Sequence, residues 1–435
     1  MRTLTVHPAS NLRGEVVIPG DKSISHRALM FASLAQGTSE IDGLLEGHDC
    51  LATLGVMRAL GVHIELTANR WLIHGRGRHA LIEPTSILDA KNSGTTMRLM
   101  AGLLSAMPFM SILDGTDQIK QRPMDRIIKP LRNMNAQIYG RQENRLAPLI
   151  TLPSKLIGVE HELMIKSAQV KSAIILAGLF AKGETRIYNA QATRDHSEKI
   201  LAHMGADIQN LGDTLLIKPL DHDLRPLALT IPGDMSSAAF LLVAGVLLAE
   251  SGITLLGVGT NVTRTGLLDA LKSMGAEIRM SNEREVAKEP VADIFIKKSR
   301  LTAQCFSGDQ IVRMIDEIPI LALAATQAFG TTVIKDASEL KVKESNRIQK
   351  TVECLKILGA HIEESDDGMI IQGPTKLHGA QVSSFGDHRL ALFLSIAGLI
   401  CTQPVIISNA EVTDDSYPGF LESLSHLGAR SVSST

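Results

Sequence analysis

The chain of 435 residues is too long for one ordinary hydrophobic core and fits two or three domains. It is 44% hydrophobic and 21% charged with a net charge of −2, a balance that excludes the disordered and fibrous classes. The same balance excludes an overall basic field for nucleic acid, and 3% aromatic residues are too few for a base-stacking platform. We therefore expect two domains and no nucleic-acid partner.

The ends and the cysteines of the chain bear on its location. The first eight residues, MRTLTVHP, lack the apolar stretch of a secretory signal, and the apolar run at residues 238–249 is too short to span a bilayer. The four cysteines are scattered, without a C-x-x-C pair or a histidine at metal-ligand spacing. We expect a cytoplasmic protein with reduced cysteines, no membrane segment and no metal.

The first feature along the chain is a hexapeptide, IPGDKS at residues 18–23, which returns as IPGDMS at residues 231–236. Both copies lead into an apolar segment, and a Pro-Gly pair interrupts regular structure strongly. We interpret the hexapeptides as crossings between two domains, with residues 21–232 in one domain and residues 1–20 and 233–435 in the other. The alternative is two similar turns inside one long domain.

Six segments are apolar on nearly every side, which is typical of helices buried on all faces. Most are followed by a turn and a short β-branched run, as at residues 183–188 and 330–334. The six segments are residues 28–35, 97–107, 173–181, 238–249, 318–328 and 390–400.

A second set of segments has apolar residues at helical spacing, as in Ile348, Val352 and Leu355, and predicts amphipathic helices. Each ends in Leu or Met followed by Gly, or by Asn135 in one case, which suits the left-handed residue that terminates a helix. The sequence thus predicts six copies of one unit, three per domain, each with strands around one buried and one half-buried helix. The helix ends lie at residues 60–62, 134–136, 204–206, 274–276, 358–360 and 427–429.

Polar residues stand where the buried helices are expected to begin. Ser, Asn and Asp are ordinary N-caps, and for Ser236 and Ser237 we adopt that interpretation. Capping does not account for the cations at the same places, because a cation opposes the positive end of the helix dipole. Backbone N–H groups with cations nearby are suited to bind phosphate. The cations are Lys22, Arg27, Lys91, Arg98, Lys166, Lys171 and Arg389.

Further cations lie near the starts of expected amphipathic helices. Arg122 stands beside a proline suited to the first helical position, and Arg194 precedes another helix. Lys343 and Arg347 are four residues apart and would share one face if that segment is helical. The dinucleotide fingerprint, the P-loop and the H-E-x-x-H motif are absent from the sequence. We expect no nucleotide cofactor and no zinc.

Five segments together resemble the EPSP synthase family of enolpyruvyl transferases: DKSISHR at 21–27, NSGT at 92–95, RP at 122–123, KESNR at 343–347 and DHR at 387–389. The resemblance covers essentially the whole chain, and the segments follow the family's order. It implies an α/β fold of two inside-out α/β barrels, with helices inside, sheets outside, and an active site in the cleft between the domains.

The resemblance also implies a reaction. The enolpyruvyl group of phosphoenolpyruvate moves to the 5-hydroxyl of shikimate 3-phosphate, and phosphate leaves through a tetrahedral intermediate, with no metal or organic cofactor. Both substrates carry a phosphate and a carboxylate, so the site requires many cations. This would place the protein in the shikimate pathway to chorismate and the aromatic amino acids.

Roles for individual residues follow from the resemblance alone. Shikimate 3-phosphate is expected to contact Lys22, Ser23, Arg27, Ser167, Ala168, Gln169, Arg194, Asp316 and Lys343. Phosphoenolpyruvate is expected to contact Lys22, Gly94, Arg122, Gln169, Arg347 and Arg389. Asp316 corresponds to the acceptor of the hydroxyl proton, and Glu344 and Lys22 to the groups that exchange protons at the methylene carbon. The alternative for Asp316 is an ordinary helix cap.

Some positions depart from the family pattern. Ala168 stands where many members have a second serine, so only its backbone can contact substrate. Arg194 stands where others have Tyr or Ser, which resembles one branch of the family. No substrate contact is assigned to the stretch at residues 415–418, where some members have a lysine.

Two alternatives remain at this point. UDP-N-acetylglucosamine enolpyruvyl transferase shares the fold but uses a cysteine on a loop before the Arg-Pro segment, and this sequence has no cysteine between Cys50 and Cys305. A non-catalytic repeat protein that binds a partner in its cleft would not need Asp316 and Glu344. We expect a monomer whose partners are the two small-molecule substrates.

Overall fold

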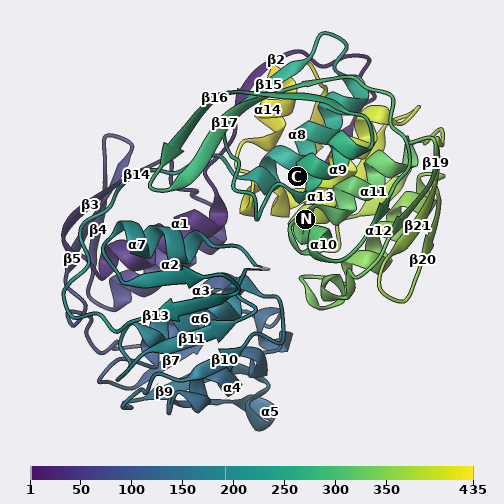
Figure 1. Cartoon of the computed structure of the whole chain (residues 1–435). Helices are drawn as coiled ribbons and strands as arrows, with labels where there is room; N and C mark the ends of the chain where they lie inside the picture. The colour runs from purple at the N-terminus through teal and green to yellow at the C-terminus, as the bar shows by residue number, and fades with distance from the viewer. Residues whose placement is uncertain (1, 192, 435) are drawn as a thin grey trace. The chain divides into compact units, whose positions relative to one another are not determined.

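The computed structural model describes residues 2–191 and 193–434, which form two compact units (Figure 1). The N-terminal unit contains Lys22–Ile231 together with Val286–Glu289. The described part of the C-terminal unit contains residues 2–21, 232–285 and 290–434. The two long boundaries lie inside the repeated hexapeptides. No pattern in the sequence predicts that Val286–Glu289 groups with the N-terminal unit.

In the described part of the N-terminal unit, the strands form three four-stranded sheets of one pattern. The first two strands of each sheet are parallel, and the other neighbours are antiparallel. In spatial order the sheets are β14 (Ala228–Thr230), β3 (Gln36–Asp42), β5 (Arg70–Arg76) and β4 (His63–Thr67); β6 (Leu88–Asp89), β7 (Ser111–Asp114), β9 (Leu146–Leu152) and β8 (Gln137–Gly140); and β10 (Glu160–Glu162), β11 (Thr185–Tyr188), β13 (Thr214–Ile217) and β12 (Ile208–Leu211).

The helices of this unit fall into an inner and an outer set. The inner helices are α1 (Lys22–Ser33), α3 (Gly94–Leu104) and α6 (Ala168–Gly178), and the outer ones are α2 (His48–Ala59), α4 (Asp125–Asn133) and α7 (His196–His203). The short η1 (Ile119–Gln121) and α5 (Arg141–Asn144) lie at loops. Nearly every residue of α3 is buried, because α3 packs against α6 as well as against the sheets.

The closest approach of α3 and α6 depends on a glycine. A Cβ atom on Gly102 would lie 2.7 Å from the Cα of Ala173, which is closer than real Cβ contacts allow. Glycine therefore lets the two backbones touch in the centre of the N-terminal unit. This contact sets the spacing between the two helix starts.

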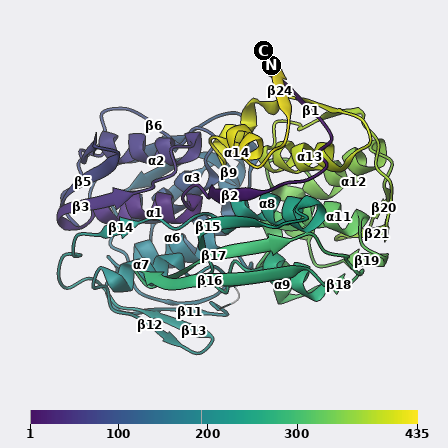
Figure 2. The same cartoon turned by 90° about the horizontal axis from the view of Figure 1, so that it is seen from above.

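The C-terminal unit repeats the same architecture. In spatial order its described sheets are β16 (Glu277–Val286), β17 (Glu289–Lys297), β15 (Ile253–Gly259) and β2 (Gly14–Val17); β18 (Cys305–Phe306), β19 (Gly330–Ile334), β21 (Met369–Gly373) and β20 (His361–Glu364); and β22 (Gln381–Ser383), β23 (Val405–Ser408), β1 (Thr3–Val6) and β24 (Ser431–Ser434). Strands β16 and β17 form the long hairpin seen in Figure 2.

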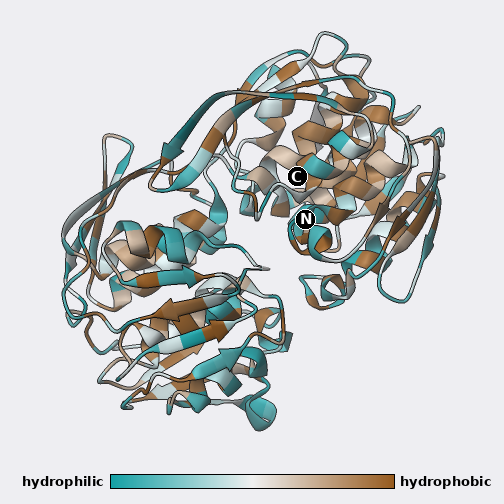
Figure 3. Cartoon of the chain, in the orientation of Figure 1, coloured by the Kyte–Doolittle hydropathy of each residue, from teal (hydrophilic) through white to brown (hydrophobic). Residues whose placement is uncertain are grey.

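Helices α8 (Met235–Leu248), α11 (Ile318–Thr326) and α13 (His388–Ile400) form the centre of this unit and contact one another. Their residues are almost all buried, and Figure 3 shows this region largely in brown. Around them lie α9 (Gly266–Ser273), α12 (Arg347–Ile357), α14 (Phe420–His426), α10 (Asp309–Val312), η2 (Ile315–Glu317), η3 (Ser338–Val342) and η4 (Ala410–Asp415). The predicted inside-out α/β fold with helices inside and sheets outside is confirmed in both units.

The parts of the two hexapeptides that belong to the C-terminal unit pair with each other. Gly20 and Gly233 form an antiparallel bridge, the Asp21 N–H donates to the Pro232 carbonyl at 2.8 Å, and the Asp234 N–H donates to the Pro19 carbonyl at 2.8 Å. The sequence repeat is therefore a local two-fold structure. Within residues 2–191 and 193–434, no helix combines the length and the apolar character needed to cross a membrane.

Candidate functional site

Most predicted site residues of the N-terminal unit lie at the starts of its three inner helices. Lys22 is the first residue of α1, and its Nζ lies 2.5 Å from Oδ2 of Asp49 on α2. Behind it, burial lowers the pKa of His26 to about 3; Asp49 opposes this shift, while Lys22 and Arg27 reinforce it. His26 is therefore neutral at physiological pH, and the positive charge of this helix start comes from Lys22 and Arg27.

Arg27 joins three helices. Its Nε donates to Ser197 Oγ on α7 at 2.8 Å, its Nη2 donates to Ser172 Oγ on α6 at 2.7 Å, and its Nη1 donates to the Ser23 carbonyl at 2.9 Å. The side chain is buried, with 3% of its surface exposed. Ser23 and the guanidinium are thus held beside the N-terminal turns of α1, α6 and α7, where backbone N–H groups favour an anion.

The starts of α3 and α6 are tied together by a second group. Gln169 Oε1 accepts a hydrogen bond from Arg98 Nη1 at 2.5 Å, and Gln169 Nε2 donates to Thr95 Oγ1 at 3.0 Å. A Cβ added to Gly94 would lie 3.0 Å from Arg98 Nη1 and 3.1 Å from Arg122 Nη1. The buried guanidinium groups of Arg98 and Arg122 therefore leave little room for a side chain at Gly94, the first residue of α3.

Arg98, to which the sequence pattern assigns no substrate, contacts the predicted site residue Gln169. It belongs to the cations noted near helix starts, but only the structure shows that it orients Gln169. Lys91, noted on the same grounds, instead lies at the surface, 2.6 Å from Asp89 Oδ2. A cation before a helix can point away from it, so position in the sequence alone does not select the functional one.

A buried lysine, Lys171, holds the backbone just before Arg194. Lys171 Nζ donates to the Ala190 carbonyl at 3.0 Å and to the Thr193 carbonyl at 3.3 Å, and it lies 2.6 Å from Glu198 Oε1. The buried Lys171 ammonium is thus engaged by two backbone carbonyls and one carboxylate. Arg194 itself is partly buried, immediately before Asp195, the N-cap of α7.

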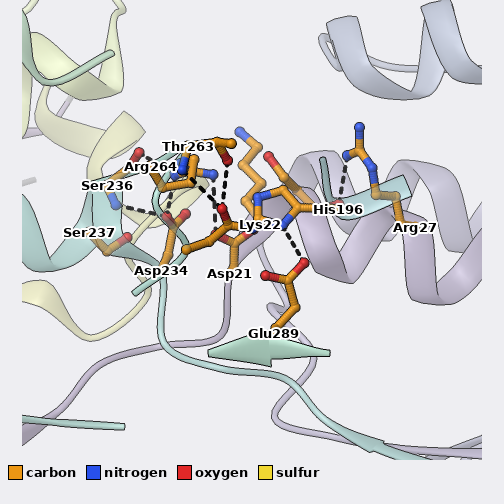
Figure 4. Close-up of polar contacts among 12 residues, drawn as sticks. Asp21, Lys22, Arg27, His196, Asp234, Ser236, Ser237, Thr263, Arg264 and Glu289 are labelled. Atoms are coloured by element: carbon orange, nitrogen blue, oxygen red, sulfur yellow. Dashed lines mark hydrogen bonds and ion pairs between the residues drawn. The ribbon is translucent and has the colours of Figure 1, made fainter. Parts of the chain in front are cut away.

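Next to the loop that carries Arg194, a buried hydrogen-bonded pair that no sequence motif predicts joins the first residue of α7 to the first residue of β17. His196 Nδ1 lies 2.8 Å from Glu289 Oε1, and each side chain is 2% exposed (Figure 4). Glu289 also lies 3.9 Å from Lys199 on α7. The pair fixes the first turn of α7, next to Arg194, through a contact between residues 93 positions apart.

In the C-terminal unit, the predicted catalytic carboxylates lie together with the predicted cations. Oδ1 of Asp316 is 3.3 Å from Lys343 Nζ and 3.2 Å from Arg347 Nη1. Glu344 Oε2 is 2.6 Å from Arg347 Nη2. Both carboxylates are mostly shielded, with 15% and 19% of their side chains exposed, so their charges interact strongly with these cations.

Arg347 is the centre of this cluster. Asp387, the N-cap of α13, accepts from its Nε at 2.9 Å and from its Nη2 at 3.1 Å, and Ser345 Oγ donates to the same carboxylate at 2.9 Å. Burial lowers the pKa of Arg347, but Asp387, Glu344 and Asp316 outweigh it and hold the pKa above its ordinary value. Arg347 therefore remains a permanent cation in a fixed orientation.

Arg389 and Arg264 complete the polar groups of this unit. Arg389 Nη1 donates to the Ser236 carbonyl at 3.0 Å. Arg264, a residue that the sequence did not indicate, lies 2.8 Å from Asp234 Oδ1 and 3.3 Å from Asp21 Oδ2, and donates to Ser236 Oγ at 2.6 Å (Figure 4). It joins the equivalent aspartates of the two hexapeptides.

Four local interpretations from the sequence are corrected by the structure. Asp234, not Ser236 or Ser237, caps α8, and Ser236 Oγ is instead hydrogen-bonded to Glu317. Asp316 lies in the 3-10 turn before α11, and the N-cap position of α11 belongs to Glu317, so Asp316 is not the N-cap residue of that helix.

The other two corrections concern helix starts. Pro123 precedes the N-cap Met124 of α4 and is not its first helical residue. Lys343 ends η3 with extended backbone and Arg347 begins α12, so one continuous helix does not hold them. They meet through Asp316 instead.

Comparisons with known proteins decide the family. The family model described as EPSP synthase (3-phosphoshikimate 1-carboxyvinyltransferase) matches residues 6–424. The chain belongs to the EPSP synthase family. The alternative of a different enolpyruvyl transferase is not favoured, and a non-catalytic repeat protein finds no support in this match.

Close relatives cover nearly the full chain. A 3-phosphoshikimate 1-carboxyvinyltransferase of Desulforamulus reducens is 49% identical over 97% of this chain and 98% of its own length. One of Citrifermentans bemidjiense is 46% identical over 98% and 99%, respectively. The solved EPSP synthase of Acinetobacter baumannii is 40% identical, with a TM-score of 0.90 and full coverage of both chains. The enolpyruvyl transferase NikO of Streptomyces tendae, at 18% identity and a TM-score of 0.81, supports the fold.

Proposed function

We propose that this chain transfers the enolpyruvyl group of phosphoenolpyruvate to the 5-hydroxyl of shikimate 3-phosphate and releases phosphate. Membership of the family and the names of its relatives support this reaction. The observation that carries the proposal is the contact of Asp316 with both Lys343 and Arg347. A protein that merely bound anions would gain nothing from carboxylates placed among its cations.

Shikimate 3-phosphate is assigned mainly to the N-terminal unit. Arg27 and the serines at the starts of α1 and α6 offer charge-assisted hydrogen bonds and backbone N–H groups to its phosphate. Ala168 contributes its backbone, and Asp316 and Lys343 of the C-terminal unit act on the same substrate. The full set is Lys22, Ser23, Arg27, Ser167, Ala168, Gln169, Arg194, Asp316 and Lys343.

Phosphoenolpyruvate is assigned to the cations that surround Gly94 and to those of the C-terminal unit. Arg122 stands against Gly94, where a small ligand can approach the backbone at the start of α3. Arg347 and Arg389 are held rigidly by their carboxylate and carbonyl partners, so little rotamer entropy is lost on binding. The full set is Lys22, Gly94, Arg122, Gln169, Arg347 and Arg389.

The chemistry then divides among three groups. Asp316 takes the proton of the 5-hydroxyl while the hydroxyl oxygen bonds to C2 of phosphoenolpyruvate. Glu344 or Lys22 delivers a proton to C3 of phosphoenolpyruvate. In the second half, the C2–O bond to phosphate breaks, and the proton lost from C3 returns to the group that supplied it. Substrate anions compete with Asp316 for Lys343 and Arg347, which strengthens Asp316 as a base once both are bound.

Phosphate release tests this function. The purified chain should release phosphate from phosphoenolpyruvate when shikimate 3-phosphate is added and not when UDP-N-acetylglucosamine is added. Phosphate release only with UDP-N-acetylglucosamine would contradict the proposed acceptor. If neither acceptor leads to phosphate release, the proposed reaction is contradicted. We further propose that the chain acts as a monomer in the cytoplasm, which light scattering of the purified protein tests in part.

A further inference from the structure

The outer face of one sheet carries two histidines and a glutamate on adjacent strands. His63 of β4 lies directly opposite His74 of β5, and Glu65 stands two residues along β4 on the same face. The two imidazole rings are stacked, with centroids 4.9 Å apart. β4 is the edge strand of this sheet, so the three side chains stand at its border.

Each oxygen of the Glu65 carboxylate lies near the ring of a different histidine. Glu65 Oε1 lies 3.2 Å from His74 Nε2, and Glu65 Oε2 lies 3.7 Å from His63 Nε2. One nitrogen or oxygen from each of the three residues lies within 4.8 Å of the others. Zinc bonds to N and O of about 2.0 to 2.2 Å in a tetrahedron separate neighbouring ligand atoms by roughly 3.4 Å, so small rotations bring all three into range.

A fourth residue fixes one of the rings. Thr38 Oγ1 lies 3.0 Å from His74 Nδ1, and Thr38 stands opposite His74 on β3. In metal sites the second nitrogen of a histidine is usually hydrogen-bonded, which sets the tautomer and leaves the first nitrogen for the metal. The contact with Thr38 has this form and directs Nε2 of His74 towards Glu65.

We propose that His63, Glu65 and His74 bind one divalent transition-metal ion of the zinc class. Imidazole and carboxylate ligands suit Zn²⁺ and its neighbours in the first row, and the exposure of His63 leaves a position for water. The ion would pin the edge strand β4 to β5 and stabilise the folded N-terminal unit by mass action. This site is independent of the proposed reaction, because none of its residues belongs to the sets assigned to shikimate 3-phosphate and phosphoenolpyruvate.

The fifth repeat supplies a natural comparison. There His361 and Glu363 of β20 repeat the pattern of His63 and Glu65, and Thr331 of β19 repeats that of Thr38. The residue opposite both His361 and Thr331 is Gln372, where the first repeat has His74. The two sheets thus differ at the proposed site by one ligand.

Zinc titration calorimetry on the full chain, after removal of metals with a chelator, tests the proposal. The wild type should bind one Zn²⁺ tightly, and His74→Gln should weaken that site by at least tenfold, while the matched control His361→Gln leaves it unchanged. Thr38→Val should weaken it by roughly tenfold through loss of the outer hydrogen bond. Gln372→His should create a second site and raise the stoichiometry from one to two.

All the altered side chains stand on outer sheet faces, and the unfolding temperature of each variant verifies its fold. Zn²⁺ should raise that temperature for the wild type and His361→Gln but not for His74→Gln. Equal zinc affinity of His74→Gln and the wild type overturns the proposal. So does a Gln372→His variant that binds no second ion.

Discussion

Asp316 Oδ1 and Arg347 Nη1 lie 3.2 Å apart, although most of the Arg347 guanidinium is already engaged by Asp387 and Glu344. One cation thus serves three carboxylates, and Lys343 supplies the second cation that Asp316 contacts. Because the Asp387 contacts fix the guanidinium through two hydrogen bonds, Arg347 orients Asp316 rather than following it. This arrangement suits a carboxylate that acts on a proton at a fixed point.

The first prediction concerns that carboxylate. Asp316→Asn keeps the size of the side chain and removes the proton acceptor, so kcat should fall by about 10²-fold or more while the KM values change little. Steady-state kinetics of phosphate release measure this. Glu363→Gln, which neutralises an exposed carboxylate on β20, is the control and should leave both constants unchanged. A loss confined to KM would show that Asp316 binds substrate without taking part in the chemistry.

The second prediction concerns Gly94. A methyl group there would lie 3.0 Å from Arg98 Nη1 and 3.1 Å from Arg122 Nη1, so both buried guanidiniums must shift by a few tenths of an ångström. Because Arg122 is assigned to phosphoenolpyruvate, Gly94→Ala should raise the KM for that substrate about tenfold and leave the KM for shikimate 3-phosphate nearly unchanged. Initial rates with each substrate varied in turn decide this. Equal changes in both constants would contradict the assignment.

The third prediction concerns the contact between α3 and α6. Gly102→Ala forces the two helix backbones apart and should lower the free energy of unfolding by about 1 to 3 kcal/mol, as overpacking does. Gly55→Ala, on the exposed side of α2 with open space around it, should raise the same quantity by about 0.5 to 1 kcal/mol. Urea unfolding of both variants measures the contrast. Stabilisation by both substitutions would show that α3 and α6 do not touch as described.

Much of the fold could be predicted from local patterns. The inner helices are apolar on all sides, so segments such as α8 and α11 are recognisable without any knowledge of their partners. Helix ends were equally clear, because Gly205 and Gly275 have the positive φ that only glycine adopts readily. Both features depend only on residues that are close in sequence, so the sequence alone is enough to predict the inner helices and the helix ends.

The site was predictable only in part. The cations at helix starts were visible, but whether a side chain turns towards the helix start depends on partners far along the chain. Arg98 orients Gln169 across 71 positions, and Arg264 joins Asp21 and Asp234 across 243 and 30 positions. Lys91 shows the opposite outcome, since Asp89 holds it at the surface. No local spacing in the sequence distinguishes a cation that contacts distant polar residues, such as Arg98, from one held at the surface, such as Lys91.

The fourth prediction concerns stability as a function of pH. Burial lowers the pKa of His26 to about 3, against an ordinary value of 6.5, so the folded chain keeps His26 neutral while the unfolded chain protonates it below pH 6.5. The unfolded state then binds more protons, and the free energy of unfolding falls by about 1.4 kcal/mol per pH unit from pH 6.5 down towards 3.

His26→Asn isolates this contribution. The amide can still contact Thr53, whose Oγ1 lies 2.7 Å from His26 Nδ1, but it does not titrate. Urea unfolding at pH 7.5 and 5.5 should show the wild type losing about 1.4 kcal/mol more than the variant over this interval, since all other groups are common to both. Equal losses would mean that His26 is protonated in the folded chain, which would place a further positive charge between Lys22 and Arg27 and alter the charge available for binding phosphate.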